Sequence, residues 1–187
     1  MRNASTAYLL TCAAIGVATG LLTVPATAFS TALAPIAPPV AALAYGAWSI
    51  GFVVALRLLE RPGAGVLTGL LSGLVAMPLS ATGPAIVVTN VLYALLLELP
   101  FLLALYRRWH TWMYYAGTAV VATLYAVWSV TAADMQSFAP WMLAAFVVVA
   151  IASPLVGTWL GILIADRLTR AGVARTARRR RAGTAAG

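Results

Sequence analysis

Six apolar stretches, each close to the length of a membrane-crossing helix, dominate the sequence. A helix needs about 20 residues to cross the hydrocarbon core of a bilayer. The stretches lie at residues 7–28, 40–59, 63–80, 85–105, 112–132 and 141–165. Hydrophobic residues make up 63% of the chain and charged residues only 9%, a balance unlike that of soluble domains. We therefore predict an all-α integral membrane protein, with a bundle of six transmembrane helices in residues 1–172 and a disordered basic tail at 173–187.

The basic residues fix the orientation of this bundle. All twelve are Arg, and six crossings place every one of them on the same face, either in the segments before span 1 and after spans 2, 4 and 6 or at the ends of those spans. The segments 29–39, 81–84 and 133–140 on the opposite face carry none. Because positive segments stay in the cytoplasm, we expect both termini inside and the protein in the cell membrane. The same rule explains the basic pI, so no nucleic-acid partner is expected.

The amino-terminal stretch has two interpretations. Arg2, the apolar run and Ala26-Thr27-Ala28 resemble a secretory signal with its cleavage site. Alternatively the run is a retained first helix, which its length and small residues favour. Cleavage would leave five spans in the same orientation, so the charges do not decide between the two. The mass of the purified protein would distinguish a cleaved signal from a retained helix.

The sequence carries no pattern typical of catalysis or of metal binding. Cys12 is the single cysteine and His110 the single histidine, and one of each cannot build a zinc site. No pair of intramembrane carboxylates, Ser-His arrangement or phosphate-binding loop is present. We expect a protein that is not an enzyme and that needs no cofactor.

Small residues recur at four-residue spacing in three of the spans. This spacing places them on one face of a helix and lets a second helix approach closely. Most such faces pack inside a bundle, but three of them leave room for one to meet a partner protein. They comprise Ala14 and Ala18 beside Gly16 and Gly20, then Gly65, Gly69 and Gly73, then Gly157, Gly161 and Ala165.

Glu98 is the one acidic residue inside a span. On an upright helix it would lie about 20 Å from the outer boundary, and an ionisable group so deep is by default functional. The alternative is a structural Glu held by a neighbouring helix. Pro100 follows directly and removes a backbone donor, so a bend is expected there.

Aromatic and polar side chains gather in the outer half of the bundle. An interfacial belt explains the rings at the inner boundary, but some outer rings lie deeper than a belt. Belt and pocket remain open alternatives. A pocket of flat rings above an acidic floor would bind a small aromatic molecule entering from outside. Its predicted residues are Tyr45, Trp48, Asn90, Tyr93, Glu98, Tyr125 and Trp128.

Several of these features together resemble a known family. They are six short spans, the stretch Tyr45-Gly46-Ala47-Trp48, the turn Arg61-Pro62-Gly63-Ala64, Leu97-Glu98-Leu99 and the basic tail. Over residues 7–172 the chain is similar to the YkoE-type S components of energy-coupling factor (ECF) transporters. The turn is the most specific of these motifs.

The resemblance implies a membrane-embedded subunit that binds thiamine or its hydroxymethylpyrimidine part. It also implies a transmembrane coupling (T) subunit and two cytoplasmic ATPase subunits as partners, besides membrane lipid. In such proteins an Ala-xxx-Ala face of the first helix docks on the coupling subunit, and Ala14 and Ala18 match it. The chain departs from the family in having no acidic residue along span 3, which argues against a cationic ligand such as thiamine. Two alternatives stay open: a membrane scaffold that transports nothing, and a stand-alone proton-coupled transporter that uses Glu98.

Overall fold

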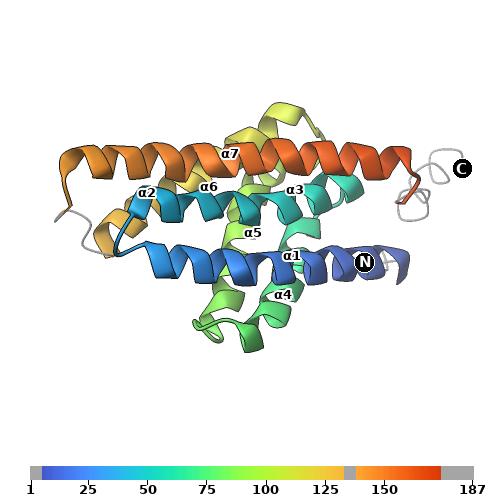
Figure 1. The fold of residues 1–187 in the computed structure, drawn as a ribbon. Helices are drawn as coiled ribbons and strands as arrows, with labels where there is room; N and C mark the ends of the chain where they lie inside the picture. Colours follow the sequence, from blue (N-terminus) through green and yellow to red (C-terminus); the bar gives the residue numbers. More distant parts are fainter. Residues whose placement is uncertain (1–5, 133–137, 174–187) are drawn as a thin grey trace, which may run out of the picture.

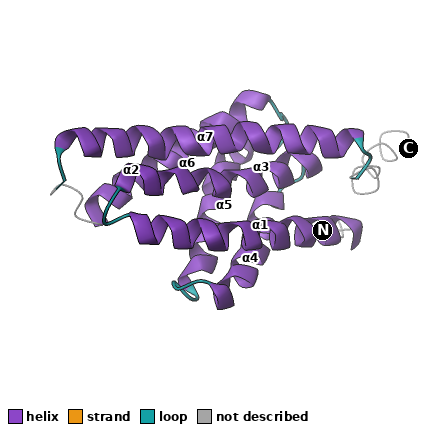
Figure 2. Cartoon of the chain, in the orientation of Figure 1, coloured by secondary structure: helices purple, strands orange, loops and turns teal. Residues whose placement is uncertain are grey.

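The computed structural model describes residues 6–132 and 138–173, and the helices found there confirm the predicted all-α membrane bundle (Figures 1 and 2). Five helical segments are long and apolar enough to cross a membrane, and the sixth, Ala64–Leu79, is shorter. The predicted basic tail and Arg2 lie outside the described residues. The elements are α1 (Thr6–Leu33), α2 (Pro38–Ala41), the 3-10 turn η1 (Ala42–Tyr45), α3 (Gly46–Leu59), α4 (Ala64–Ala76), the 3-10 turn η2 (Met77–Leu79), α5 (Ala85–Leu103), α6 (Thr111–Ala132) and α7 (Pro140–Arg170).

Two helices extend beyond their predicted ends. We expected the first span to end at residue 28 and the last at 165, but α1 continues to Leu33 and α7 to Arg170. Pro25 does not end α1. In lipid an interrupted helix leaves backbone groups without partners, and continuing the helix keeps them bonded.

The helices do not all run in one direction. Figure 1 shows α1, α3 and α7 side by side along one axis, whereas α5 crosses this axis steeply. The beginning of α1, the α3–α4 turn and the end of α7 lie toward the same end of the bundle. The Arg residues of the α3–α4 turn and of α7 are therefore gathered at that end, which we call the inner end.

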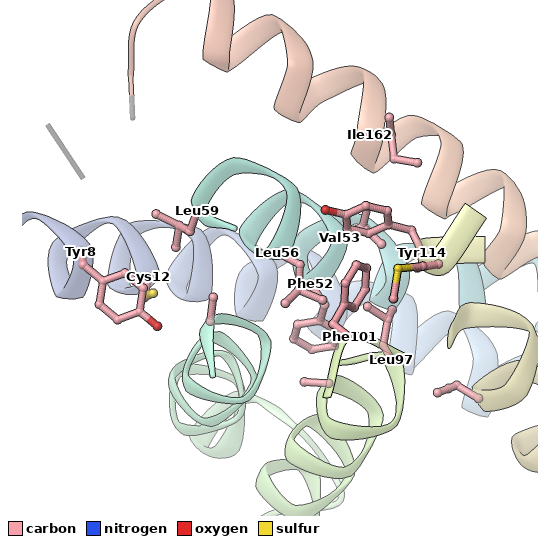
Figure 3. Close-up of a cluster of buried hydrophobic side chains, with 14 residues drawn as sticks. Tyr8, Cys12, Phe52, Val53, Leu56, Leu59, Leu97, Phe101, Tyr114 and Ile162 are labelled. Carbon is pink, nitrogen blue, oxygen red and sulfur yellow. The ribbon is translucent and has the colours of Figure 1, made fainter. Parts of the chain in front are cut away.

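Helix α3 is the centre of the bundle. Its residues from Gly51 to Leu56 are all buried, as expected for a helix that is apolar on every side. Figure 3 shows Phe52 and Leu56 of α3 among Leu97, Phe101 and Tyr114 from α5 and α6. This core supports the residues described next.

Most of the small-residue faces are internal packing seams, as the sequence indicated. A Cβ atom at Gly20 would lie 2.7 Å from the backbone oxygen of Ser72 on α4, and one at Gly69 would lie 2.8 Å from that of Asn90 on α5. Gly157 and Gly161 pack in the same way against α3. Only glycine allows these approaches, so the seams fix how α1, α4, α5 and α7 surround the core.

Candidate functional site

A pocket lies where α3, α5, α6 and α7 meet. Its space, counting the open mouth, is about 360 Å³. Four aromatic side chains form much of its wall, and the lining includes no charged residue. The lining residues are Tyr45, Trp48, Thr89, Tyr93, Ala122, Tyr125, Ala150 and Pro154.

Tyr45 is the centre of an aromatic cluster around the pocket. Its ring meets that of Tyr125 edge to face with centroids 5.0 Å apart, and those of Phe146 and Trp48 at 6.4 and 6.5 Å. Edge-to-face pairs of this kind are favourable beyond their buried area. The rings hold one another in place and present flat faces and edges to the pocket.

Hydrogen bonds behind the pocket fix the other rings. The indole Nε1 of Trp48 donates to Asn90 Oδ1 over 3.1 Å, and the amide of Asn90 in turn donates to Ser72 Oγ over 3.3 Å. The hydroxyl of Tyr93 lies 2.7 Å from Ser49 Oγ. The indole of Trp48 and the hydroxyl of Tyr93 are therefore already paired. A ligand in the pocket would meet rings of fixed orientation and few free hydrogen-bond donors.

The backbone that carries Tyr45 is held by one serine of α7. Ser153 Oγ accepts a hydrogen bond from the N–H of Gly46 over 2.9 Å and donates to the carbonyl of Leu43 over 2.7 Å. These bonds join α7 to the short 3-10 turn η1, where the helix geometry changes just before the pocket. Ser153 therefore positions Tyr45 without lining the pocket itself.

Replacing Ser153 by Ala should lower the free energy of unfolding by about 1–3 kcal/mol, because it removes two hydrogen bonds that contribute about 0.5–1.5 kcal/mol each. Thermal unfolding of the purified protein in detergent measures this change. Thr169→Ala is the matched control on the same helix, since the hydroxyl of Thr169 donates to the carbonyl of Ala165 within its own helix. Equal effects of the two substitutions would show that Ser153 has no special role at η1.

The structure brings together four of the seven residues predicted for a binding pocket. Tyr45, Trp48, Tyr93 and Tyr125 line it, and Asn90 holds Trp48 from behind. The ring of Trp128 is tilted against that of Tyr125 with centroids 5.5 Å apart, but Trp128 is 59% exposed on the outside of the bundle and does not line the pocket.

Glu98 lies elsewhere, and its carboxylate binds the beginning of α4. The N–H of Gly63 donates to Oε1 over 2.6 Å and that of Val66 to Oε2 over 3.2 Å. Helix α4 has no side-chain cap of its own, because Gly63 occupies its N-cap position with φ of 76°. A carboxylate satisfies the orphan donors of a helix start and interacts favourably with its dipole. Glu98, only 1% exposed, therefore caps a neighbouring helix.

The prediction that Glu98 forms an acidic floor of the pocket is therefore wrong. The expectation assumed an upright helix, whereas α5 crosses the bundle steeply (Figure 1) and brings Glu98 against the α3–α4 turn. Tyr106 of the α5–α6 turn lies near the same carboxylate. Burial and the charge of Glu98 raise the pKa of Tyr106 to about 12.

The sequence interpretation missed four lining residues: Thr89, Ala122, Ala150 and Pro154. Ala122, Ala150 and Pro154 are small apolar residues, and the prediction considered only aromatic and polar ones. Pro154, inside α7, was the available signal, because a proline inside a helix often bends it.

The predicted docking residues lie on the outside of the bundle. Ala14 and Ala18 are exposed on α1, beside the exposed Leu10, Val17 and Leu21, while Gly16 and Gly20 on the opposite side pack against α4. The first helix thus has one inward seam and one outward small-residue face. Cys12 is fully buried, as expected for a core residue.

The donor groups at the pocket do not form a metal site. Among residues 6–132 and 138–173, no three His, Cys, Asp or Glu side chains are grouped closely enough to hold a metal ion. The lining supplies phenol, indole and hydroxyl groups and apolar surface. This chemistry suits an uncharged organic molecule.

These features define a multi-pass membrane protein with a small, aromatic-lined pocket among its helices. Residues 8–124, more than half of the chain, match the family described as "ABC-type cobalt transport system, permease component", and the chain belongs to this family. It is therefore a membrane component of a transport system, and the prediction that it is not an enzyme is confirmed.

A solved structure gives a likeness in fold over nearly the whole length. A crystal structure of an S-component of an ECF transporter superposes with a TM-score of 0.79, at 20% sequence identity and covering 98% of each chain. The chain therefore has the S-component fold, as the resemblance implied. No curated protein matches it in sequence.

Proposed function

We propose that the chain is the substrate-binding S component of an ECF transporter and binds a small uncharged heteroaromatic molecule in its aromatic pocket. Hydroxymethylpyrimidine, the ligand class of YkoE-type S components, is our candidate. The observation that carries the proposal is the pocket wall of Tyr45, Trp48, Tyr93 and Tyr125, without a charged lining residue. Family membership and the S-component fold support the transport role.

The lining chemistry favours an organic cargo over a bare cobalt ion, although the family description names cobalt transport. Divalent transition metals are bound by imidazole, thiolate or carboxylate groups, and none of these lines the pocket. Aromatic rings instead stack on flat heterocycles.

The same lining favours the pyrimidine part over thiamine itself. Thiamine carries a cationic thiazolium, whose natural counter-charge would be a carboxylate. The oxygens of the buried Glu98 bind the beginning of α4 instead, and Asp166 of α7 pairs with Arg57. Cation–π contacts alone would have to hold the cation. We therefore expect hydroxymethylpyrimidine to bind more tightly than thiamine.

Transport would require partners, and the exposed face of α1 is our candidate for binding them. S components work with a transmembrane coupling subunit and two ATPase subunits, and Ala14 and Ala18 match the small-residue face that meets the coupling subunit. Their exposure beside apolar neighbours is compatible with close helix packing against another protein.

Ala14→Leu and Ala18→Leu should each abolish uptake in cells that contain the partner subunits, while ligand binding by the purified protein stays unchanged. The larger side chains would hold the two helices apart. Ala144→Leu is the control, because Ala144 is an exposed alanine on another helix. Normal uptake by both α1 variants would exclude this face as the docking site.

The alternative of a stand-alone proton-coupled transporter is less well supported. Such a protein needs an ionisable group at its substrate site, and the carboxylate of Glu98 caps α4 outside the pocket lining. Uptake of radiolabelled hydroxymethylpyrimidine with and without the coupling and ATPase subunits separates the two. Uptake that needs the partners supports an S component, and full uptake by the chain alone would contradict it. A scaffold without transport predicts partner association and no bound small molecule.

A further inference from the structure

The α5–α6 turn carries an exposed pair of positive charges. Arg107 and Arg108 are both exposed, and the sequence from Leu99 to Ala133 contains no acidic residue. In the part of the chain that the structure describes, neither guanidinium lies within 4.0 Å of a carboxylate; the ion pair found there joins Arg57 and Asp166. The pair is available to an anion from outside the chain.

The turn that holds the two arginines is fixed. Leu105 and Tyr106 adopt left-handed backbone angles with φ of 51° and 53°, and the N–H of Tyr106 donates to the carbonyl of Phe101 over 2.7 Å. Trp109 stacks on the buried ring of Phe101 with centroids 4.8 Å apart. The two arginines therefore lie between two anchored aromatic residues, Tyr106 and Trp109, and binding an anion needs little ordering of the backbone.

Large exposed apolar side chains lie within four residues of the arginine pair in the sequence. Leu103 is 75% exposed, Leu105 68% and Trp112 64%. A purely ionic site for a free anion does not need exposed apolar neighbours of this size. A phospholipid would contact both the charged and the apolar side chains, because its phosphate pairs with arginine and its acyl chains cover leucine and tryptophan.

We propose that the α5–α6 turn binds the headgroup of an anionic phospholipid of the inner leaflet. Arg107 and Arg108 bind the phosphate, and Leu103, Leu105 and Trp112 contact the acyl chains. The site lies against the α3–α4 turn, because Tyr106 is close to Glu98 and Gly63. A bound lipid would stabilise the contact between these two turns. The proposal is independent of the transported molecule.

Native mass spectrometry of the detergent-purified protein, titrated with phosphatidylglycerol or with phosphatidylcholine, tests the proposal. We expect phosphatidylglycerol to bind more tightly, and the double variant R107Q/R108Q to weaken its binding about 30-fold. The matched control is R167Q/R170Q, which removes the same charge from two exposed arginines at the end of α7. The melting temperature of each variant without added lipid checks that its fold is intact.

The controls separate a specific site from general attraction. Equal weakening in both double variants would show non-specific attraction to charge and overturn the proposal. Inorganic phosphate that stabilises the wild-type protein as much as phosphatidylglycerol does would assign the pair to a free anion and also overturn it. An unchanged lipid affinity in R107Q/R108Q would do the same. The proposal is supported if phosphatidylglycerol binding weakens in R107Q/R108Q alone and inorganic phosphate does not replace the lipid.

Discussion

Replacing Trp48 by Ala should weaken the binding of hydroxymethylpyrimidine by at least about 30-fold, the effect of losing an aromatic anchor worth about 2 kcal/mol. The substitution removes a ring that lines the pocket and leaves Asn90 without its indole donor. It also removes an edge contact of Tyr45. Isothermal titration calorimetry with the purified protein in lipid nanodiscs measures the affinity.

Trp128 provides a matched control for this experiment. It is the same residue type in the same half of the bundle, and its ring lies near that of Tyr125, but it is exposed and outside the pocket lining. Trp128→Ala should change the affinity less than threefold. If both tryptophan variants bind as the wild-type protein does, the aromatic pocket is not the binding site.

Glu98→Ala should produce the largest loss of stability, about 3 kcal/mol or more in the free energy of unfolding. It removes two hydrogen bonds to a charged acceptor, and such bonds contribute about 1.5–3 kcal/mol each. It also leaves the partly buried N–H groups of Gly63 and Val66 without this acceptor. Glu98→Gln keeps the shape and one acceptor oxygen, so it should have an intermediate effect. Equilibrium unfolding in mixed micelles gives the values.

Asp166→Asn is the comparison for this loss. Asp166 pairs with Arg57 over 3.1 Å, but its side chain is partly exposed, and exposed ion pairs contribute about 0–1 kcal/mol. A loss at Glu98 no larger than that at Asp166 would contradict a capping role. Hydroxymethylpyrimidine affinity is the second readout: folded Glu98→Gln protein should bind as tightly as wild type, whereas a carboxylate that contacts the ligand predicts weaker binding.

The helices could be predicted from the sequence because membrane helices depend on local properties. Apolar length and the position of the arginines are visible along the chain, and lipid allows few alternatives to a helix. The glycine seams were predictable for the same reason, since their four-residue spacing is local. The extra length of α1 and α7 was not predicted, because the expected ends followed the length needed to cross a bilayer, whereas a helix in lipid continues where an end would leave backbone groups without partners.

The pocket was predictable only in part. Aromatic residues in the outer half of the spans can be recognised in the sequence, and four of them line the pocket: Tyr45, Trp48, Tyr93 and Tyr125. Glu98 shows the limit. A capping bond between α5 and α4 depends on the steep tilt of α5, and no pattern along the chain gives that angle. The unusual start of α4, where Pro62 and Gly63 supply no capping side chain, was the signal that an acceptor must come from another helix.

Mass spectrometry of the small molecules released when the purified protein is denatured is the most direct test of the proposed function. The protein should be purified from cells supplied with both hydroxymethylpyrimidine and thiamine. We expect wild-type and Trp128→Ala protein to release the uncharged pyrimidine in near-stoichiometric amount and Trp48→Ala protein to release little or none. Release of thiamine in preference to the pyrimidine, or of neither from the wild-type protein, would contradict an uncharged heteroaromatic as the ligand of this pocket.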